Sequence, residues 1–485
     1  MQNPAFDRLR NWITADDPRI AMSGVLFVVV LAGVLAGALF GGLGPILAVG
    51  LLGALVIGVL MLRSTQAGLF ALVALIALLP YGALPFKVGF RPTFIDVALG
   101  ALFAVWALRL ITGRQHTFVA SPLGILIFAF QGWAIFIFIF GLRYGGLNIT
   151  VARNFAEIIL SVSLFFLIVN QVRTVTQLEW VSRAIIFAGA GTAALGIIFY
   201  IIPQNWTVQI LSTLRVFQYP TQGILRYIED DPTQPMRAIA TSIDPNALGG
   251  LMVFLTIITV AFLFSARPVI RRRYLFVISG LMLLTLYLTF SRGSLLGVVA
   301  GLGVIGLLRY RKMIWAMVAL AAVVVLLPQT QLYVARFVEG IRGEDLATQM
   351  RFGEYKDAFN LISRYPLTGV GFFGTPDIDV YVGVSSVYLL LAQQLGLVGA
   401  GLYILIGAGF LLIVFGAFRQ LPAGHRLEGP LLAYGAAILG AMVGGVFDHF
   451  YLNLTFIHIA ALYWMVMGLG MVAVLLWRAE SESSD

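Results

Sequence analysis

Apolar stretches of about twenty residues recur along the whole chain, and short polar segments separate them. A helix needs about this length to cross the hydrocarbon core, whereas the strands of a membrane barrel alternate polar and apolar residues. We therefore expect an all-α polytopic membrane protein, a single domain over residues 1–485 with about 14 spanning helices (12–14). The apolar windows are 21–40, 44–62, 67–82, 92–112, 121–141, 150–172, 180–202, 246–266, 274–290, 293–309, 312–328, 396–418, 429–447 and 456–477.

The composition agrees with this class of protein. Hydrophobic residues make up 60% of the chain and charged residues 11%, which is not the composition of a soluble domain. Because there is no cysteine, disulfides, thiol catalysis and cysteine metal sites are excluded. The net charge is +9, but the basic residues are spread over short loops. We therefore expect contact with membrane lipid and no nucleic acid as a partner.

The distribution of basic residues predicts the orientation, because cytoplasmic loops are rich in Lys and Arg. With a cytoplasmic N-terminus, arginine-rich loops such as 267–273 and 309–312 lie inside, and both termini are cytoplasmic. The short outer loops hold fewer basic residues: Lys87, Arg91, Arg143 and Arg292.

Two outer segments are long, residues 203–245 and residues 329–395, whereas every inner loop is short. We expect the function to lie outside, with the larger segment carrying part of the active site. Charges in long loops report poorly on topology, so their arginines need another explanation, and an anionic substrate supplies one. The basic residues of the two segments include Arg215, Arg226, Arg237, Arg336, Arg342, Arg351, Lys356 and Arg364.

The larger outer segment contains a helical pattern at residues 350–362. Phe352, Tyr355, Phe359 and Ile362 follow helical spacing, which predicts a helix that lies at the membrane interface. A plain surface loop is the alternative.

Two arginines lie close to the ends of predicted spans. Arg292 belongs to an outer turn too short to leave the membrane surface, and Arg153 lies near the outer start of the sixth span. A guanidinium group is costly there unless it reaches water or lipid phosphate, or binds a substrate phosphate. Both explanations stay open, and both residues are candidates for substrate contact.

Histidine and carboxylate side chains are candidates for acid–base chemistry. His449 follows Asp448 at the outer end of a span, where it is either a proton acceptor or a polar helix end. Asp377 and Asp379 have the spacing of a metal–nucleotide site, but no sugar nucleotide is expected on the outer side. Metalloprotease, Walker and nucleophile-elbow motifs do not occur.

Short motifs follow one another in a fixed order over residues 240–400. They are Asp244-Pro245-Asn246, Ser291-Arg292-Gly293, Arg351 with Glu354 and Ala358, Tyr365-Pro366-Leu367-Thr368-Gly369-Val370-Gly371, Ser385-Ser386-Val387-Tyr388-Leu389 and Gln394-Leu395-Gly396-Leu397-Val398-Gly399. This order resembles the O-antigen ligase and Wzy-type O-antigen polymerase superfamily of polytopic bacterial glycosyltransferases. The N-terminal half matches only as a series of hydrophobic spans.

The resemblance implies a glycosyltransferase without metal or cofactor, at the outer face of the bacterial cytoplasmic (inner) membrane. It would move a glycan from an undecaprenyl-diphosphate carrier to an acceptor, with a flippase and a chain-length regulator as partners. Arg292 and Arg351 would bind the diphosphate and stabilise the charge of the leaving group. Together with Arg153, the candidates for substrate binding are Asp244, Asn246, Ser291, Tyr355, Ser385 and Tyr388.

The sequence departs from the resemblance at Ser385, where ligases of this superfamily usually carry a histidine. Serine is a poor base, so His449, Asp448 or Glu354 serves instead, or the reaction needs little base. This difference favours a Wzy-type polysaccharide polymerase over an O-antigen ligase that transfers glycan to lipid A core or another acceptor.

Two functions of other classes remain as alternatives. Many spans with buried arginines also suit a transporter or flippase of a lipid-linked or anionic solute. Transporters often have internal repeats and midplane binding sites, and the sequence halves show no convincing repeat. A scaffold whose outer loops dock a partner is the other alternative.

Overall fold

The computed structural model describes residues 64–482 except Val88, His116 and 375–382, together with isolated positions before residue 64. The chain divides into two units at residue 64, and the helices below belong to the second unit. The first two predicted spans fall before residue 64, so apart from those isolated positions they lie outside the described residues.

Five helices open the second unit, and capping side chains set where several of them begin. Asn148 caps α7, while Thr93 with Asp96 and Thr174 with Gln177 form capping boxes on α5 and α8. These side chains satisfy backbone groups that the first helical turn leaves unpaired. The helices are α4 (Thr65–Leu78), α5 (Phe94–Ile111), α6 (Gly124–Gly141), α7 (Ile149–Gln171) and α8 (Val175–Ile201).

The segment predicted as the first long outer loop folds into short helices and a hairpin. Strand β1 (Arg226–Tyr227) pairs antiparallel with β2 (Met236–Arg237), so that Arg226 lies opposite Arg237. In the turn, Glu229 and Asp230 have positive φ angles of 58° and 55°, a left-handed conformation that is costly for residues with a Cβ atom. The other elements are α9 (Gln204–Thr213), η1 (Leu214–Phe217), η2 (Ile228–Asp230) and η3 (Ala240–Ser242).

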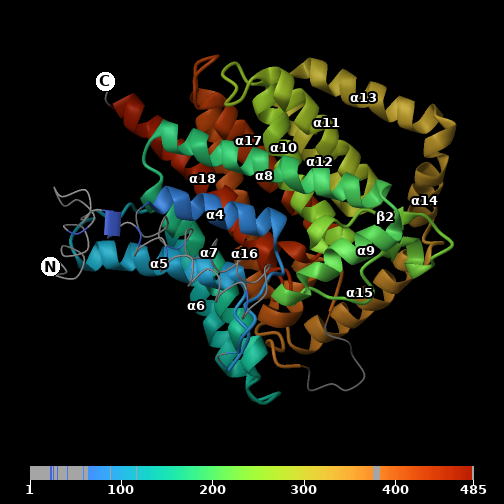
Figure 1. Cartoon of the computed structure of the whole chain (residues 1–485), viewed down its shortest axis with the longest axis horizontal. Coiled ribbons are helices and arrows are strands. Elements are labelled where there is room, and N and C mark those ends of the chain that lie inside the picture. The colour runs from blue at the N-terminus through green and yellow to red at the C-terminus, as the bar shows by residue number, and fades with distance from the viewer. Residues whose placement is uncertain are drawn as a thin grey trace. The chain divides into compact units, whose positions relative to one another are not determined.

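Glycines let the helices α12 (Arg292–Leu308) and α17 (Glu428–Phe447) approach closely. A Cβ atom on Gly297 would lie 2.7 Å from the carbonyl oxygen of Gly440, and one on Gly301 would lie 2.8 Å from that of Ala436. Such backbone contact is a main source of helix association in a bilayer. Neighbouring helices are α10 (Pro245–Phe264), α11 (Arg272–Leu288), α16 (Val387–Gln420) and α18 (Ile457–Glu482), of which α10 and α18 are buried along most of their length (Figure 1).

Three helices follow one another along the outside of this unit (Figure 1). On α15, Ala358 and Leu361 are buried, whereas Phe352 and Phe359 are 58% and 60% exposed. The sequence pattern thus predicted a helix correctly, and its position at the membrane interface stays a prediction. The helices are α13 (Arg311–Leu326), α14 (Gln331–Arg342) and α15 (Leu346–Arg364), with η4 (Pro328–Thr330) between the first two.

The turn that follows α15 packs against a break in helix α16. At the break, Gly396 has φ 70° and ψ 179°, and the N–H of Leu397 donates to the carbonyl oxygen of Pro366 at 2.8 Å. A Cβ atom on Gly396 would lie 2.0 Å from the carbonyl oxygen of Leu367, so only glycine fits. Two of the sequence motifs therefore join through their backbones and hold the end of α15 against the bundle.

The structure is that of an all-α polytopic membrane protein, but fourteen spans are not confirmed. Every predicted window after residue 64 overlaps a helix. Among the described residues, eight helices are long and apolar enough to cross a membrane, or nine if α13 and its bent continuation count as one. Helices α4 and α12 are apolar but shorter, and the 14 residues of α4 span only about 21 Å.

Candidate functional site

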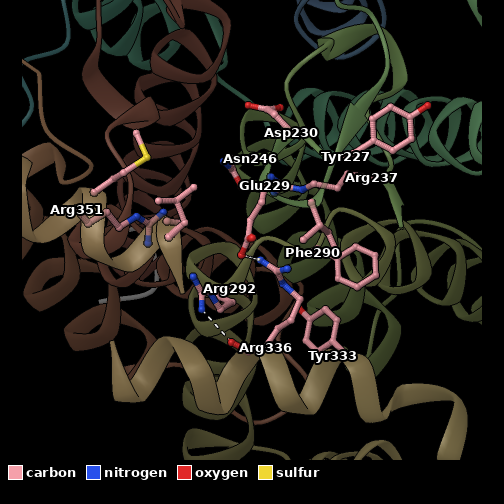
Figure 2. A pocket seen from close by; sticks show the side chains of 14 residues that line it. Tyr227, Glu229, Asp230, Arg237, Asn246, Phe290, Arg292, Tyr333, Arg336 and Arg351 are labelled. Atoms are coloured by element: carbon pink, nitrogen blue, oxygen red, sulfur yellow. Dashed lines mark hydrogen bonds and ion pairs between the residues drawn. The ribbon is translucent and has the colours of Figure 1, made fainter. Parts of the chain in front are cut away.

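Four arginine side chains from four separate segments meet at one cavity of about 220 Å³ (Figure 2). Arg237 ends the hairpin, Arg292 begins α12, Arg336 lies on α14 and Arg351 lies on α15. Guanidinium groups gathered in this way suit an anion with several oxygens. The lining also includes Tyr227, Glu229, Asp230, Asn246, Phe290 and Tyr333.

Arg292 is engaged by a carboxylate within the protein. Its two terminal nitrogens donate to both oxygens of Asp345 at 2.8 and 2.9 Å, and one of them also donates to the carbonyl oxygen of Arg336 at 3.0 Å. The hydrogen bonds from Arg292 hold the pKa of Asp345 well below its usual range, against the effect of burial. Asp345 also caps α15 by accepting from the N–H of Thr348. Arg292 therefore ties α12 to both α14 and α15.

The residues on either side of Arg292 contact other helices, which accounts for the Ser-Arg-Gly motif. The hydroxyl of Ser291 bonds to that of Ser294 at 2.9 Å, and both side chains pack against Gly249 of α10. A Cβ atom on Gly293 would lie 3.1 Å from Oδ2 of Asp448. Glycine thus leaves room for that carboxylate beside the first turn of α12.

Arg237 is held by neutral oxygens. It donates to the carbonyl oxygen of Thr289 at 2.8 Å and to Oδ1 of Asn246 at 2.5 Å. Burial lowers the pKa of Arg237 to about 10, while the charges of Asp244 and Asp448 act in the opposite direction. Asp244 itself caps α10 by accepting from the N–H of Ala247 at 2.7 Å. The Asp244-Pro245-Asn246 motif thus positions both a helix and an arginine.

Arg351 faces a buried carboxylate with an unusual pKa. One of its terminal nitrogens lies 3.7 Å from Oδ1 of Asp448, which is 5% exposed. Burial raises the pKa of Asp448 to about 7, although the charge of Arg351 lowers it. In the described part of the chain, Oδ2 of Asp448 and Nδ1 of His449 are buried without a hydrogen-bond partner. Burial also lowers the pKa of His449, so the ring is neutral at neutral pH.

The loop at Ser385 packs onto α15 and onto the end of α17. The N–H of Ser385 donates to Glu354 at 2.8 Å, and the hydroxyl of Tyr355 approaches the carbonyl oxygen of Ser385 at 3.4 Å. The ring of His449 lies close to the backbone of Val384, the residue before Ser385. His449 therefore lies near position 385, where ligases of the superfamily usually carry a histidine. It comes, however, from a different segment of the chain.

Comparison with known families identifies one part of the chain. Residues 277–404 match the family model described as O-antigen ligase. We call this segment the O-antigen ligase domain, after the family that it matches. The match supports the resemblance of the chain to the O-antigen ligase and Wzy superfamily, and it supports a glycan-handling function. No curated protein matches the sequence.

The O-antigen ligase domain covers about a quarter of the chain, and the cavity draws residues from within it and from outside. Among the arginines that line the cavity, Arg292, Arg336 and Arg351 lie inside the matched range and Arg237 lies before it. Asp448, which contacts Arg351 but does not line the cavity, lies after it. The site therefore depends on packing between the matched segment and its flanking helices.

Arg153 lies apart from the residues that line the cavity. Its guanidinium group pairs with Asp96 at 3.2 Å and with Glu157 at 2.8 Å, and Thr93 also donates to Glu157. These contacts link α5 to α7. Tyr388 likewise has a partner within the protein, since its hydroxyl donates to the carbonyl oxygen of Met442 at 2.7 Å. The substrate roles of both residues stay predictions.

Several residues at the site were not predicted as site residues. Arg237 and Arg336 were noted only as basic residues of the outer segments, and nothing in their neighbourhood marked them. Asp345 carries a weak signal, because an aspartate three residues before Thr348 is typical of a helix N-cap. Its pairing with Arg292, 53 positions earlier, has no sequence signature.

No group of three or more metal-ligating side chains occurs among the described residues. Asp377 and Asp379, the pair with metal-site spacing, lie outside those residues.

We expect Asp345→Asn to destabilise the protein. Asparagine still caps α15, but it cannot pair with the charge of Arg292, and a half-buried arginine left without its counter-charge costs about 2–4 kcal/mol. Because the pair lowers the pKa of Asp345, the wild-type contribution is complete above about pH 4 and is lost only as the pH falls through the lowered value. The measurement is the thermal unfolding temperature in detergent at pH 7.

Glu344→Gln is the matched control for this prediction, since Glu344 is the adjacent carboxylate and is exposed. It should unfold at the wild-type temperature. An Asp345→Asn variant as stable as Glu344→Gln would show that the ion pair does not hold α12 to α15.

Proposed function

We propose that this protein transfers a glycan from a polyprenyl-diphosphate carrier to a hydroxyl acceptor at the outer face of the cytoplasmic membrane. One observation carries the proposal: four arginines from four segments line one cavity, and one of them, Arg351, contacts a buried carboxylate with a raised pKa. The O-antigen ligase domain supports the same class of reaction.

The outer face is inferred from the helix ends that form the site. Arg292 begins α12, Asp244 caps α10 and Asp448 follows α17. The positive-inside pattern assigns each of these ends to the outer side, and the structure brings the site residues at these ends together. Arg309 and Glu428, at the opposite ends of α12 and α17, pair with each other at 2.8 Å.

In the proposed reaction, an acceptor hydroxyl oxygen attacks the anomeric carbon of the donor glycan. The bond from that carbon to the phosphate oxygen breaks, and the carrier diphosphate leaves with the electron pair. Negative charge grows on the diphosphate during this step, so fixed guanidinium groups stabilise the transition state more than the ground state. Arg351 is suited to this role because its contact with Asp448 is long at 3.7 Å. Arg292, by contrast, already has two short bonds to Asp345.

Asp448 is the proposed general base that takes the proton of the acceptor hydroxyl. A base works best when its pKa lies near the working pH, and burial raises the pKa of Asp448 to about 7. Its Oδ2 atom has no hydrogen-bond partner in the described part of the chain. Glu354, the third candidate, accepts from the backbone of Ser385 and thereby positions that loop.

The acceptor decides between two activities. We propose a Wzy-type polymerase, in which a second carrier-linked repeat unit is the acceptor. Ligation to lipid A core or another acceptor is the second candidate, and the description of the matched family favours it. The serine at position 385, where ligases of the superfamily usually carry a histidine, is the feature that favours the polymerase.

Purified protein incubated with a synthetic undecaprenyl-diphosphate repeat unit tests the proposal. We expect a ladder of longer carrier-linked glycans on a gel. A single transfer to added lipid A core, without a ladder, would assign ligation. Counterflow of labelled solute in liposomes, without any new glycosidic bond, would contradict both activities and favour transport.

A further inference from the structure

Arg336 differs from the other arginines of the cavity in how it is held. Arg292 has two short bonds to a carboxylate, and Arg237 bonds to two neutral oxygens. Among the described residues, the guanidinium group of Arg336 pairs only with Glu229, and the N–O distance of 3.5 Å exceeds that of a charge-assisted hydrogen bond. Figure 2 shows the two side chains directed toward each other within the cavity.

The main chain of Arg336 is nevertheless fixed. Its carbonyl oxygen accepts from Arg292, which is itself held by Asp345. The side chain therefore extends from a fixed segment of main chain. It is 18% exposed and lines the cavity. A preorganised guanidinium with one loose partner is well suited to exchange that partner for another anion.

Glu229 lies in a strained turn that places its carboxylate close to Arg336. Glu229 and Asp230 are consecutive residues in the left-handed conformation, at φ 58° and 55°. The hairpin imposes this geometry, since the N–H of Ile228 donates to the carbonyl oxygen of Pro235 at 3.2 Å and the side chain of Ile228 is buried. Backbone strain of this kind persists where the surrounding structure fixes it, and it often occurs at ligand sites.

We propose that Arg336 is a phosphate-binding residue and that Glu229 is its resident counter-anion, which a diphosphate displaces when it enters the cavity. The inference rests on the proposed function for its ligand class, a diphosphate ester. Without substrate, Glu229 then partly balances the charge of Arg336. A diphosphate displaces Glu229 more readily than a monoanion does, because it carries more charge and more oxygens for the arginines that line the cavity.

Binding of two probes to the purified protein tests this proposal without any glycan transfer. The probes are farnesyl diphosphate and inorganic pyrophosphate, and the measurement is isothermal titration calorimetry in detergent. Glu229→Gln keeps the shape of the side chain but removes its charge, so we expect both probes to bind about three- to tenfold more tightly. The ratio of the wild-type Kd to the Glu229→Gln Kd should be the same for both probes, since the substitution acts on phosphate binding. A lower Kd for farnesyl diphosphate than for pyrophosphate would indicate a lipid-linked ligand.

Glu339→Gln is the matched control, because Glu339 is an exposed carboxylate on α14, three residues after Arg336, and does not line the cavity. Its Kd values should equal those of the wild type. In the background of Arg336→Gln, which should itself weaken binding, Glu229→Gln should have no further effect. That loss of the effect would show that the two residues act on each other.

Two results would overturn the inference: unchanged Kd values in Glu229→Gln, or tighter binding of farnesyl diphosphate alone. A protein that binds both probes as expected but forms no glycosidic bond would retain the phosphate site and lose the proposed transferase activity.

Discussion

Arg351→Ala is expected to reduce glycan transfer by about a thousandfold or more, because this arginine stabilises charge that appears only as the diphosphate leaves. The loss should fall mainly on kcat, with a smaller rise in KM, since the interaction is strongest in the transition state. The measurement is steady-state transfer from a synthetic carrier-linked donor. Arg351→Lys should recover little, because lysine cannot present two parallel donors.

The same variant should shift the pH profile of the residual activity. The charge of Arg351 lowers the pKa of Asp448, whereas burial raises it. Removing that charge raises the pKa of Asp448 further, so residual transfer should require a higher pH. Arg342→Ala is the control, since Arg342 is an exposed arginine at the end of α14. An Arg351→Ala enzyme with the rate and pH profile of Arg342→Ala would exclude Arg351 from catalysis.

Asp448→Asn should lower kcat by about a hundred- to ten-thousandfold, the usual contribution of a general base. In the wild type, transfer should rise with pH as Asp448 loses its proton near its pKa of about 7. The variant should lose this rise, because the amide does not ionise. Initial rates at a series of pH values measure both the lower kcat and the loss of the rise with pH. The series runs from about pH 5 to about pH 9, roughly two units on each side of the pKa.

His449→Gln provides the comparison for this second prediction. Burial lowers the pKa of His449, so the ring is already neutral where Asp448 titrates, and its loss should leave the rise with pH in place. If Asp448→Asn retained that rise and His449→Gln abolished it, the base would be the histidine, and the role assigned to Asp448 would be wrong.

We propose for Arg292 a different role from the phosphate contact that its position in the sequence predicted. The outer turn predicted a phosphate contact, and the residue does line the cavity. Its guanidinium group, however, is bound to Asp345 and to the backbone of Arg336. We expect Arg292 to position the arginines around it, which makes Arg336 and Arg351 the direct phosphate ligands in our proposal.

Much of the architecture follows from the sequence because its signals are local. An all-α membrane protein is predicted from apolar windows of about twenty residues, and each window can be recognised without reference to the rest of the chain. Helix caps such as Asp244 and Asp345 act within one turn, on backbone groups three residues away. The helical spacing at residues 350–362 likewise predicted α15, although the structure extends that helix to Leu346–Arg364.

The sequence alone thus determined that this protein is a bundle of membrane helices. Its ordered motifs indicated the O-antigen ligase and Wzy-type polymerase superfamily, which the family match at residues 277–404 supports. Only the tertiary structure decided which charges meet: Arg292 with Asp345, Arg336 with Glu229, and Arg351 with Asp448. In the order named, the two residues of each pair lie 53, 107 and 97 positions apart in the sequence. Their contact depends on how whole helices pack, and no local pattern of residues encodes that packing.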